Sequence, residues 1–183
     1  MKPQKKFFII GGAIALIILL SSRKMSAAAE TLIRKFEADN DVKRYLKAYQ
    51  DSAGVWTLGW GSIWHYDLKR RVQKGDQIDE ATALRYMKTE LASLIPKIRA
   101  FIKVPINSNE EGALISLAYN IGPTGLKNST LIRLLNEGKP RTLVAEEFLK
   151  WNKITDPVTK QKVPLQGLTN RRIAEKALFL KPV

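Results

Sequence analysis

Two carboxylates and a hydroxyl stand close together in the first third of the chain. Glu37 closes a stretch with helical periodicity, Asp51 lies in a turn-rich segment, and Thr57 follows it. An acid that protonates a leaving oxygen, opposed by a carboxylate that works on the far face of the sugar, is the set that glycosidic bond hydrolysis needs. Each of these residues alone would be an ordinary solvated group. The elements that position them therefore decide the interpretation.

A helix is predicted directly before the first carboxylate. Ala27 to Glu37 carries apolar residues at helical spacing. The helix should stop near Ala38 to Asp41, because Asp-Asn-Asp disfavours its continuation. Glu37 would then lie on one wall of a groove.

A hairpin is predicted next. Tyr45 to Tyr49 and Val55 to Leu58 are short β-prone runs, separated by the turn signal Gln-Asp-Ser-Ala-Gly. Asp51 would lie at the turn and Thr57 on the return strand, so both would face Glu37 from the opposite wall.

The rest of the chain predicts a helical lobe. A long helix opens at Asp79 or Glu80 and runs through Ile102, with a break expected at Pro96. The other predicted helices span Glu110 to Asn120, Ser129 to Asn136, Arg141 to Trp151 and Asn170 to Leu180. Ser129 is a good N-cap, and Gly122 and Gly138 are good C-terminal stops. The fold class is α+β, mostly helical with a small β-hairpin lobe.

The composition excludes several kinds of site. The 183 residues, 45% hydrophobic and 26% charged, indicate a globular chain with one sizeable core. The absence of cysteine excludes disulfides, thiolate zinc sites, iron–sulfur clusters and a Cys nucleophile, and the single histidine, His65, excludes a multi-His metal centre. We therefore expect no metal, and chemistry done by carboxylates, hydroxyls, lysines or backbone.

The positive charge favours a polyanionic partner. The formal net charge is +14, and the residues after Lys24 carry 26 basic and 17 acidic side chains, a balance of +9. Such a field suits nucleic acid, anionic lipid or an acidic cell-wall polymer. The sequence contains no recognised nucleic-acid-binding motif, so no nucleic acid partner is expected.

Residues 7–22 form a 16-residue uncharged run flanked by basic residues. As a helix it would span about 24 Å, short of the roughly 30 Å hydrocarbon core, which predicts a marginal signal-anchor. The larger number of lysines before the run favours a cytoplasmic N-terminus. The alternatives are a buried core helix and a signal peptide cleaved at Ala27 to Ala29, the latter disfavoured by Arg23 and Lys24. The expected division is 1–25 for the anchor and 26–183 for the catalytic domain.

Five ordered segments resemble the motifs of the phage-type lysozymes, the glycoside hydrolase family of T-even phage lysozyme. They are LIRKFEA, LKAYQDSAGVWTLGWG, EEGALISLAYNIG, KNSTLIRLLNEG and PLQGLTNRRIAEKAL, and they cover roughly residues 27 to 180. The resemblance implies a lysozyme-like fold with a cleft between lobes. It also implies a monomeric endolysin that hydrolyses, with inversion and without a cofactor, the β-1,4 bond between N-acetylmuramic acid and N-acetylglucosamine in peptidoglycan.

The resemblance also assigns roles to individual residues. Glu37 would donate the proton, and Asp51 with Thr57 would hold the attacking water. Arg171, in GLTNRR, aligns with an arginine that approaches the catalytic Glu in relatives. A positive neighbour alone would lower the pKa of that acid, so any rise must come mainly from partial burial.

The resemblance adds substrate-binding candidates. Asn120 and Gly122, in YNIG, resemble the cleft-lining segment between the lobes. Trp60, with Trp56 and Trp64, would stack on sugar rings, although core packing is the expected fate of at least one of the three.

The chain departs from the usual family pattern in two places. The family places eight residues between Glu and Asp, whereas thirteen separate Glu37 from Asp51. We interpret Ala38 to Val42 as an insertion; the alternative is loss of the acid, with Asp39 and Asp41 as fallback acids. Ser62 also stands where the family usually has a His, and His65 is expected as a surface or cleft histidine.

The leader resembles the signal-anchor-release segments of some phage endolysins, which are held at the inner membrane until the helix escapes into the periplasm. That implies a Gram-negative host and an inner-membrane tether through residues 7–22. Two other functions stay open. One is a catalytically inactive peptidoglycan-binding protein, and the other is a membrane-active cationic lysis protein acting through residues 1–24 or 170–181.

Overall fold

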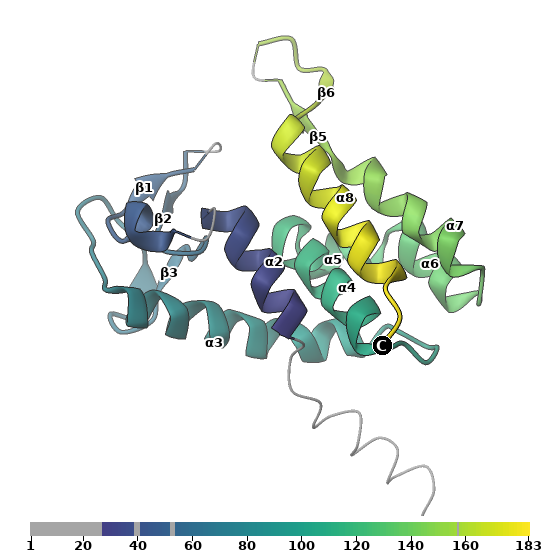
Figure 1. The fold of residues 1–183 in the computed structure, drawn as a ribbon. Coiled ribbons are helices and arrows are strands. Elements are labelled where there is room, and N and C mark those ends of the chain that lie inside the picture. Colours follow the sequence, from purple (N-terminus) through teal and green to yellow (C-terminus); the bar gives the residue numbers. More distant parts are fainter. Residues whose placement is uncertain (1–26, 39–40, 52–53, 157) are drawn as a thin grey trace, which may run out of the picture.

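The computed structural model describes residues 27–38, 41–51, 54–156 and 158–183. The predicted anchor at residues 7–22 and the fallback acid Asp39 lie outside them. No helix within the described residues is both long enough and apolar enough to cross a membrane. The described chain forms a small β-containing lobe and a larger helical lobe, with helix α3 running along both (Figure 1).

The first described helix confirms the prediction made for it. Helix α2, Ala27–Ala38, ends one residue after Glu37. Asp41 then caps a short 3-10 helix, η1 (Val42–Tyr45), by accepting a hydrogen bond from the Lys43 N–H. Glu37 is therefore carried at the C-terminal end of a regular helix.

The small lobe contains two short antiparallel hairpins: β1 (Tyr49–Gln50) with β2 (Trp56–Thr57), and β3 (Trp64–His65) with β4 (Arg70–Arg71). The first hairpin was predicted, but the strand expected over Tyr45 to Tyr49 is mostly wrong. Tyr45 belongs to the 3-10 helix, where the cap supplied by Asp41 satisfies the backbone. Only the pairs Tyr49 with Thr57 and Gln50 with Trp56 remain in register.

Helix α3, Glu80–Arg99, opens at its N-cap Asp79 as predicted but does not break at Pro96. Pro96 lies in the last turn, so its missing N–H removes only one bond near the frayed end, and the Ala100 N–H still reaches the Pro96 carbonyl at 3.1 Å. The helix ends three residues before the expected Ile102.

The helical lobe is built around α4 (Ser108–Ile121). This helix begins with an Asn107–Glu110 capping box and has Gly122, with φ +82°, as its C-cap. Helices α2 and α8 pack against it. The remaining elements are α5 (Pro123–Lys127), α6 (Thr130–Asn136), α7 (Arg141–Glu146), the 3-10 helix η2 (Glu147–Trp151) and α8 (Gln166–Leu180).

The helices predicted for this lobe are present, with shifted ends. Ser129 caps α6 as expected, and Arg141 to Trp151 is divided into α7 and η2. Helix α8 begins four residues before Asn170. The β3–β4 hairpin and helix α5 were not predicted from the sequence. A third hairpin was not predicted either: β5 (Lys153–Thr155) with β6 (Lys162–Pro164), which projects from the helical lobe (Figure 1).

Candidate active site

Glu37 lies at the end of α2 with its side chain 20% exposed. Its Oε1 accepts a hydrogen bond of 2.6 Å from the Nη1 of Arg171, which comes from α8. The first and last described helices thus meet at this carboxyl. The predicted pairing of Arg171 with the candidate acid is present in the structure.

Arg171 is itself buried, at 3% exposure, and is held by more than Glu37. Its Nε donates to Glu175 Oε1 at 3.1 Å and its Nη2 donates to the Ser116 carbonyl at 3.1 Å. Its guanidinium carbon also lies 5.9 Å from the centre of the Phe36 ring. The guanidinium is therefore fixed by α2, α4 and α8 together, and it fixes Glu37 in turn.

Glu175 is the buried anion of this network. It accepts from Ser116 Oγ at 2.7 Å and from Arg172 Nη2 at 3.0 Å, in addition to Arg171. Arg172 Nε lies 2.8 Å from Glu175 Oε2, an ion pair whose angle is not that of a hydrogen bond. Burial raises the pKa of Glu175 and lowers that of Arg172 to about 10.

The turn between β2 and β3 approaches the acid closely. Gly61, with φ +93°, lies so near that a Cβ on it would be 3.3 Å from Glu37 Oε2. A left-handed conformation and a close neighbour both favour glycine at this position. The backbone of this turn forms the part of the wall next to Glu37 Oε2.

The hairpin wall is built from local bonds around Val55. Asp51 Oδ1 accepts from the Val55 N–H at 2.9 Å, and Thr57 Oγ1 donates to the Val55 carbonyl at 3.0 Å. Asp51 is exposed, whereas Thr57 is buried. Both predicted residues are therefore anchored to the same backbone unit.

Tyr49 connects the two walls electrostatically. Its pKa is raised to about 12, first by burial and then by the negative charges of Glu37 and Asp51, with Tyr45 also contributing. The charges of both carboxylates thus act on the Tyr49 phenol. Tyr49 is also paired with Thr57 across the hairpin.

The substrate-binding candidates are placed differently from one another. Asn120 is exposed at the end of α4, and Gly122 ends that helix with open space where a Cβ would be. Trp60 is 1% exposed and packs in the core beneath the Arg34 guanidinium, so it is one ring whose fate is core packing. Trp64 is 40% exposed and Trp56 is half-buried, which leaves ring surface on both.

The expectation of a surface or cleft histidine is wrong. His65 is buried in β3, and its Nδ1 lies 2.8 Å from the Tyr86 hydroxyl. The Asp67 N–H donates to the same hydroxyl oxygen at 3.2 Å. The residue ties the small lobe to α3.

Sequence reasoning missed Glu90, Tyr119 and Glu175. Glu90 on α3 hydrogen-bonds to Ser62 Oγ and to the Tyr119 hydroxyl, so it occupies the space behind the Gly61 turn. A signal was present for each acid. Glu90 lies four residues from the buried Tyr86 and Leu94, and Glu175 lies four from the buried Phe179, so each carboxyl is on a core-facing stripe of its helix.

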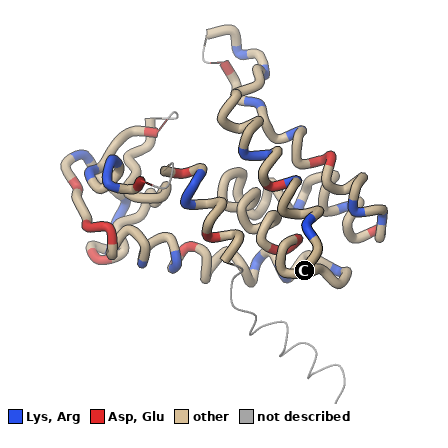
Figure 2. The backbone as a smooth tube through the Cα atoms, viewed as in Figure 1, with Lys and Arg blue, Asp and Glu red and all other residues tan. Residues whose placement is uncertain are grey.

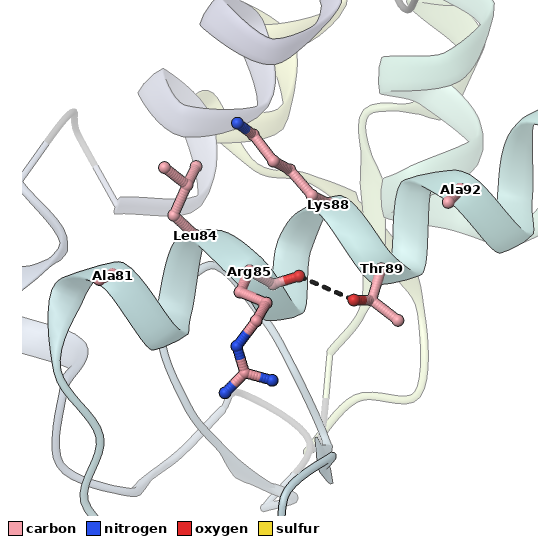
Figure 3. A pocket seen from close by; sticks show the side chains of 6 residues that line it. All are labelled: Ala81, Leu84, Arg85, Lys88, Thr89 and Ala92. Carbon is pink, nitrogen blue, oxygen red and sulfur yellow. Dashed lines mark hydrogen bonds between the residues drawn. The ribbon is translucent and has the colours of Figure 1, made fainter.

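Other features of the surface do not compete with this site. A shallow hollow of about 470 Å³ on α3 is lined by Ala81, Leu84, Arg85, Lys88, Thr89 and Ala92, and it carries no acid (Figure 3). Among the described residues, no cluster of three or more His, Cys, Asp or Glu side chains is placed to hold a metal ion. Lysines and arginines occur on both lobes (Figure 2).

The model of the phage lysozyme family matches residues 43–175. An endolysin from Acyrthosiphon pisum secondary endosymbiont phage 1 is 40% identical over 142 residues, which cover 75% of this chain and 91% of that protein. A SAR-endolysin from Pseudomonas phage phiKMV is 33% identical over 135 residues, covering 74% and 78% respectively.

Two solved structures share the fold. An endolysin from Escherichia coli O157:H7 phage FAHEc1 superposes with a TM-score of 0.77 at 34% identity, covering 88% of this chain and 96% of that one. The muramidase domain of SpmX from Asticaccaulis excentricus gives 0.73 at 27% identity, with 87% and 99% covered. The lysozyme-like architecture expected from the motifs is confirmed.

Proposed function

The chain belongs to the phage lysozyme family, and from that premise we propose how its residues cleave peptidoglycan. The protein is a glycoside hydrolase of the endolysin type, which hydrolyses cell-wall peptidoglycan for host lysis. Glu37 is the general acid, and Asp51 with Thr57 positions the attacking water. The observation that carries the proposal is the buried Arg171, which hydrogen-bonds to the Glu37 carboxyl at the end of α2.

The hydrogen bond from Arg171 favours Oε2 of Glu37 as the atom that gives up the proton. Arg171 Nη1 donates to Oε1 of Glu37, so Oε1 must keep a lone pair on that side. The proton of the neutral acid then resides on Oε2, the oxygen that faces the Gly61 turn. Oε2 protonates the leaving oxygen of the glycosidic bond.

The hairpin side supports a water-holding role. The Thr57 hydroxyl donates its proton to the Val55 carbonyl, so its oxygen can only accept a hydrogen bond from a water. Asp51 is tied to the Val55 N–H and is exposed to solvent. A water held by both residues can lose a proton to the Asp51 carboxylate as it attacks the anomeric carbon from the face opposite Glu37, which gives inversion.

The altered spacing between the carboxylates fits an insertion. Helix α2 ends at Ala38 and η1 begins at Val42, so the extra residues fall between two regular elements. Asp41 is engaged in capping η1, which argues against it as the acid.

The test of this function is hydrolysis of purified peptidoglycan by the purified protein, with new reducing ends counted and early product anomers read by NMR. We expect reducing ends to accumulate and the anomers to be inverted relative to the substrate. A membrane-active lysis protein would release no reducing ends. Retention of configuration would contradict the roles given to Asp51 and Thr57.

We also propose that residues 7–22 tether the enzyme to the inner membrane and then release it into the periplasm. The 16-residue apolar run and the similarity to a SAR-endolysin support this. Replacing Gly11, Gly12, Ala13 and Ala15 by Leu adds apolar surface, so this variant should stay in the membrane fraction and lyse late. The parent should appear partly as full-length soluble protein; a shortened soluble form would instead indicate a cleaved signal peptide.

A further inference from the structure

Glu90 carries its carboxyl on the core-facing side of its helix, where a solvated residue is not expected. It is half-buried on α3, on the stripe that contains the buried Tyr86, Met87, Leu91 and Leu94. Polar groups in such a position need hydrogen-bond partners, because burying an acid without partners is costly. The catalytic roles proposed above make no use of it.

Three hydroxyls surround Glu90. Ser62 Oγ donates to Oε1, the Tyr119 hydroxyl lies 2.9 Å from Oε2, and Tyr66 lies near enough for Glu90, after burial, to raise the pKa of its phenol to about 12. Ser62 comes from the turn that follows Gly61, Tyr66 from the small lobe, and Tyr119 from α4. Glu90 therefore joins three parts of the chain that are far apart in sequence.

The joined parts form the backing of the catalytic acid. The Tyr119 hydroxyl also lies 2.8 Å from the Trp60 carbonyl, and a Cβ on Gly61 would be 3.9 Å from Tyr119 Cε1 and 3.3 Å from Glu37 Oε2. The Trp60 to Ser62 turn is thus held from behind by Tyr119 and Glu90. Any shift of this turn moves the wall next to the oxygen that carries the proton.

We propose that Glu90, in its protonated form, is a positioning residue for the hydrolysis. It clamps the Trp60 to Ser62 turn and Tyr119 in place behind Glu37. This deepens the function proposed above and depends on it. Glu90 does not touch the reacting atoms; it acts through the backbone of the turn and the Tyr119 ring.

A count of protons favours the neutral form of Glu90. The single proton of the Tyr119 hydroxyl faces two acceptors, the Trp60 carbonyl and Glu90 Oε2. If Tyr119 donates to Trp60, a protonated Glu90 can donate to the Tyr119 oxygen, and both contacts become hydrogen bonds. An ionised Glu90 would leave one of the two acceptors without a proton.

The electrostatic surroundings agree with this count. Burial raises the pKa of Glu90 and the negative charge of Glu37 adds to the rise, while the hydrogen bonds from Ser62, Tyr119 and Tyr66 oppose it. Burial, followed by the negative charges of Glu90 and Glu37, raises the pKa of the Tyr119 phenol, and Arg171 on α8 is the positive group that opposes this rise. These are the charged and titratable groups that face the clamp.

A pair of substitutions separates the clamp from simple packing. Glu90→Gln copies the neutral acid, since its oxygen can accept from Ser62 while its amide donates to Tyr119. Glu90→Leu fills similar space without either bond. On soluble glycan oligomers of the wall, we expect Glu90→Leu to lower kcat about tenfold or more with little change in KM, as for a misplaced catalytic group. Glu90→Gln should restore kcat to within about twofold of the parent.

A hydroxyl deletion provides a second test that does not depend on Glu90→Leu folding. Tyr119→Phe keeps the ring beside Gly61 and removes the link between Glu90 and the Trp60 carbonyl, so kcat should fall several-fold with KM unchanged. The matched control is Tyr86→Phe, which removes a buried hydroxyl from the same helix that bears Glu90 but whose partners are His65 and Asp67. Its kcat should equal that of the parent.

The outcomes are distinct from those that test the function itself. A parent that releases no reducing ends refutes the hydrolase proposal. An active parent whose kcat survives both Glu90→Leu and Tyr119→Phe refutes the clamp alone. The clamp is also refuted if Glu90→Gln loses as much kcat as Glu90→Leu, or if Tyr86→Phe falls as far as Tyr119→Phe.

Discussion

The two walls of the candidate active site are built in opposite ways. Glu37 is fixed by Arg171, 134 positions away in sequence, and Arg171 is fixed by Glu175 on its own helix and by the Ser116 carbonyl on α4. Asp51 and Thr57 are fixed by Val55, within four residues of each. The first wall depends on the packed helical lobe and the second on one tight turn.

This difference indicates where stability and activity are coupled. The acid needs a defined position and a partly dry setting, which buried long-range contacts provide. The water proposed to attack needs access to the hairpin, where Asp51 is exposed to solvent while Thr57 is buried beside it. Substitutions behind the acid should therefore cost folding free energy as well as rate, whereas substitutions in the hairpin should cost mainly rate.

The largest expected effect is that of Glu37→Gln. The amide keeps the shape of the acid and can accept from Arg171, but it cannot give a proton, so hydrolysis should fall by about 10³-fold or more while the melting temperature barely changes. Asp41→Asn is the matched control, because Asn also caps helices well, and its activity should be close to that of the parent. Substantial activity in Glu37→Gln would mean that another group is the acid.

The next effect tests the helical wall through Glu175→Gln. Replacing the buried carboxylate by a neutral amide takes the shared negative partner away from Arg171 and Arg172. The free energy of unfolding, measured by denaturant unfolding, should therefore fall by about 3 kcal/mol or more. Glu146→Gln is the control, since it removes an exposed carboxylate from the ion pair with Lys176 and should cost less than about 1 kcal/mol. Equal losses would mean that the buried network does not hold this wall.

The hairpin wall should respond in rate and not in stability. Asp51→Asn and Thr57→Ala should each lower kcat by about 10- to 100-fold, because the attacking water loses one of its two partners. Each should change unfolding free energy by about 1 kcal/mol or less, as the bonds removed are local. A large loss of stability in either variant would remove the contrast between the walls.

The local wall is also the one that sequence reasoning predicted well. The turn signal around Asp51 and the β-prone run up to Leu58 are encoded within a few residues, so the hairpin itself was predicted from the sequence. The roles given to Asp51 and Thr57 came from the family resemblance and stay a prediction. The strand limits were wrong at Tyr45 because Asp41 caps a 3-10 helix there. Short-range capping competed with β propensity and prevailed.

The long-range wall needed the family motifs. The pairing of Arg171 with Glu37 was expected only through the resemblance, since no local pattern links residues on the first and last described helices. Glu175 and Glu90 were missed because a charged residue inside an apolar stripe has no local partner to reveal its role. Pro96 was misjudged because its cost depends on its distance from the helix end.

The smallest effect concerns the pH dependence of stability in Glu90→Gln. Glu90 has a folded pKa above its ordinary 4.5, so the unfolded chain loses this proton first as pH rises. The native state then binds more protons than the unfolded state between the two pKa values, and the contribution of Glu90 to stability falls across that window.

The contribution of Glu90 is fully present below about pH 4.5 and is lost as pH rises through the folded pKa, by about 1.4 kcal/mol for each unit of the rise. Glu90→Gln cannot titrate, so its stability relative to the parent should improve from pH 4 to pH 7 in denaturant unfolding. The matched control is Glu80→Gln, which removes an exposed carboxylate from the same helix. A stability difference for Glu90→Gln that stays constant with pH would mean that Glu90 is already ionised where an ordinary glutamate is, and the clamp behind Glu37 would lose its proton-dependent character.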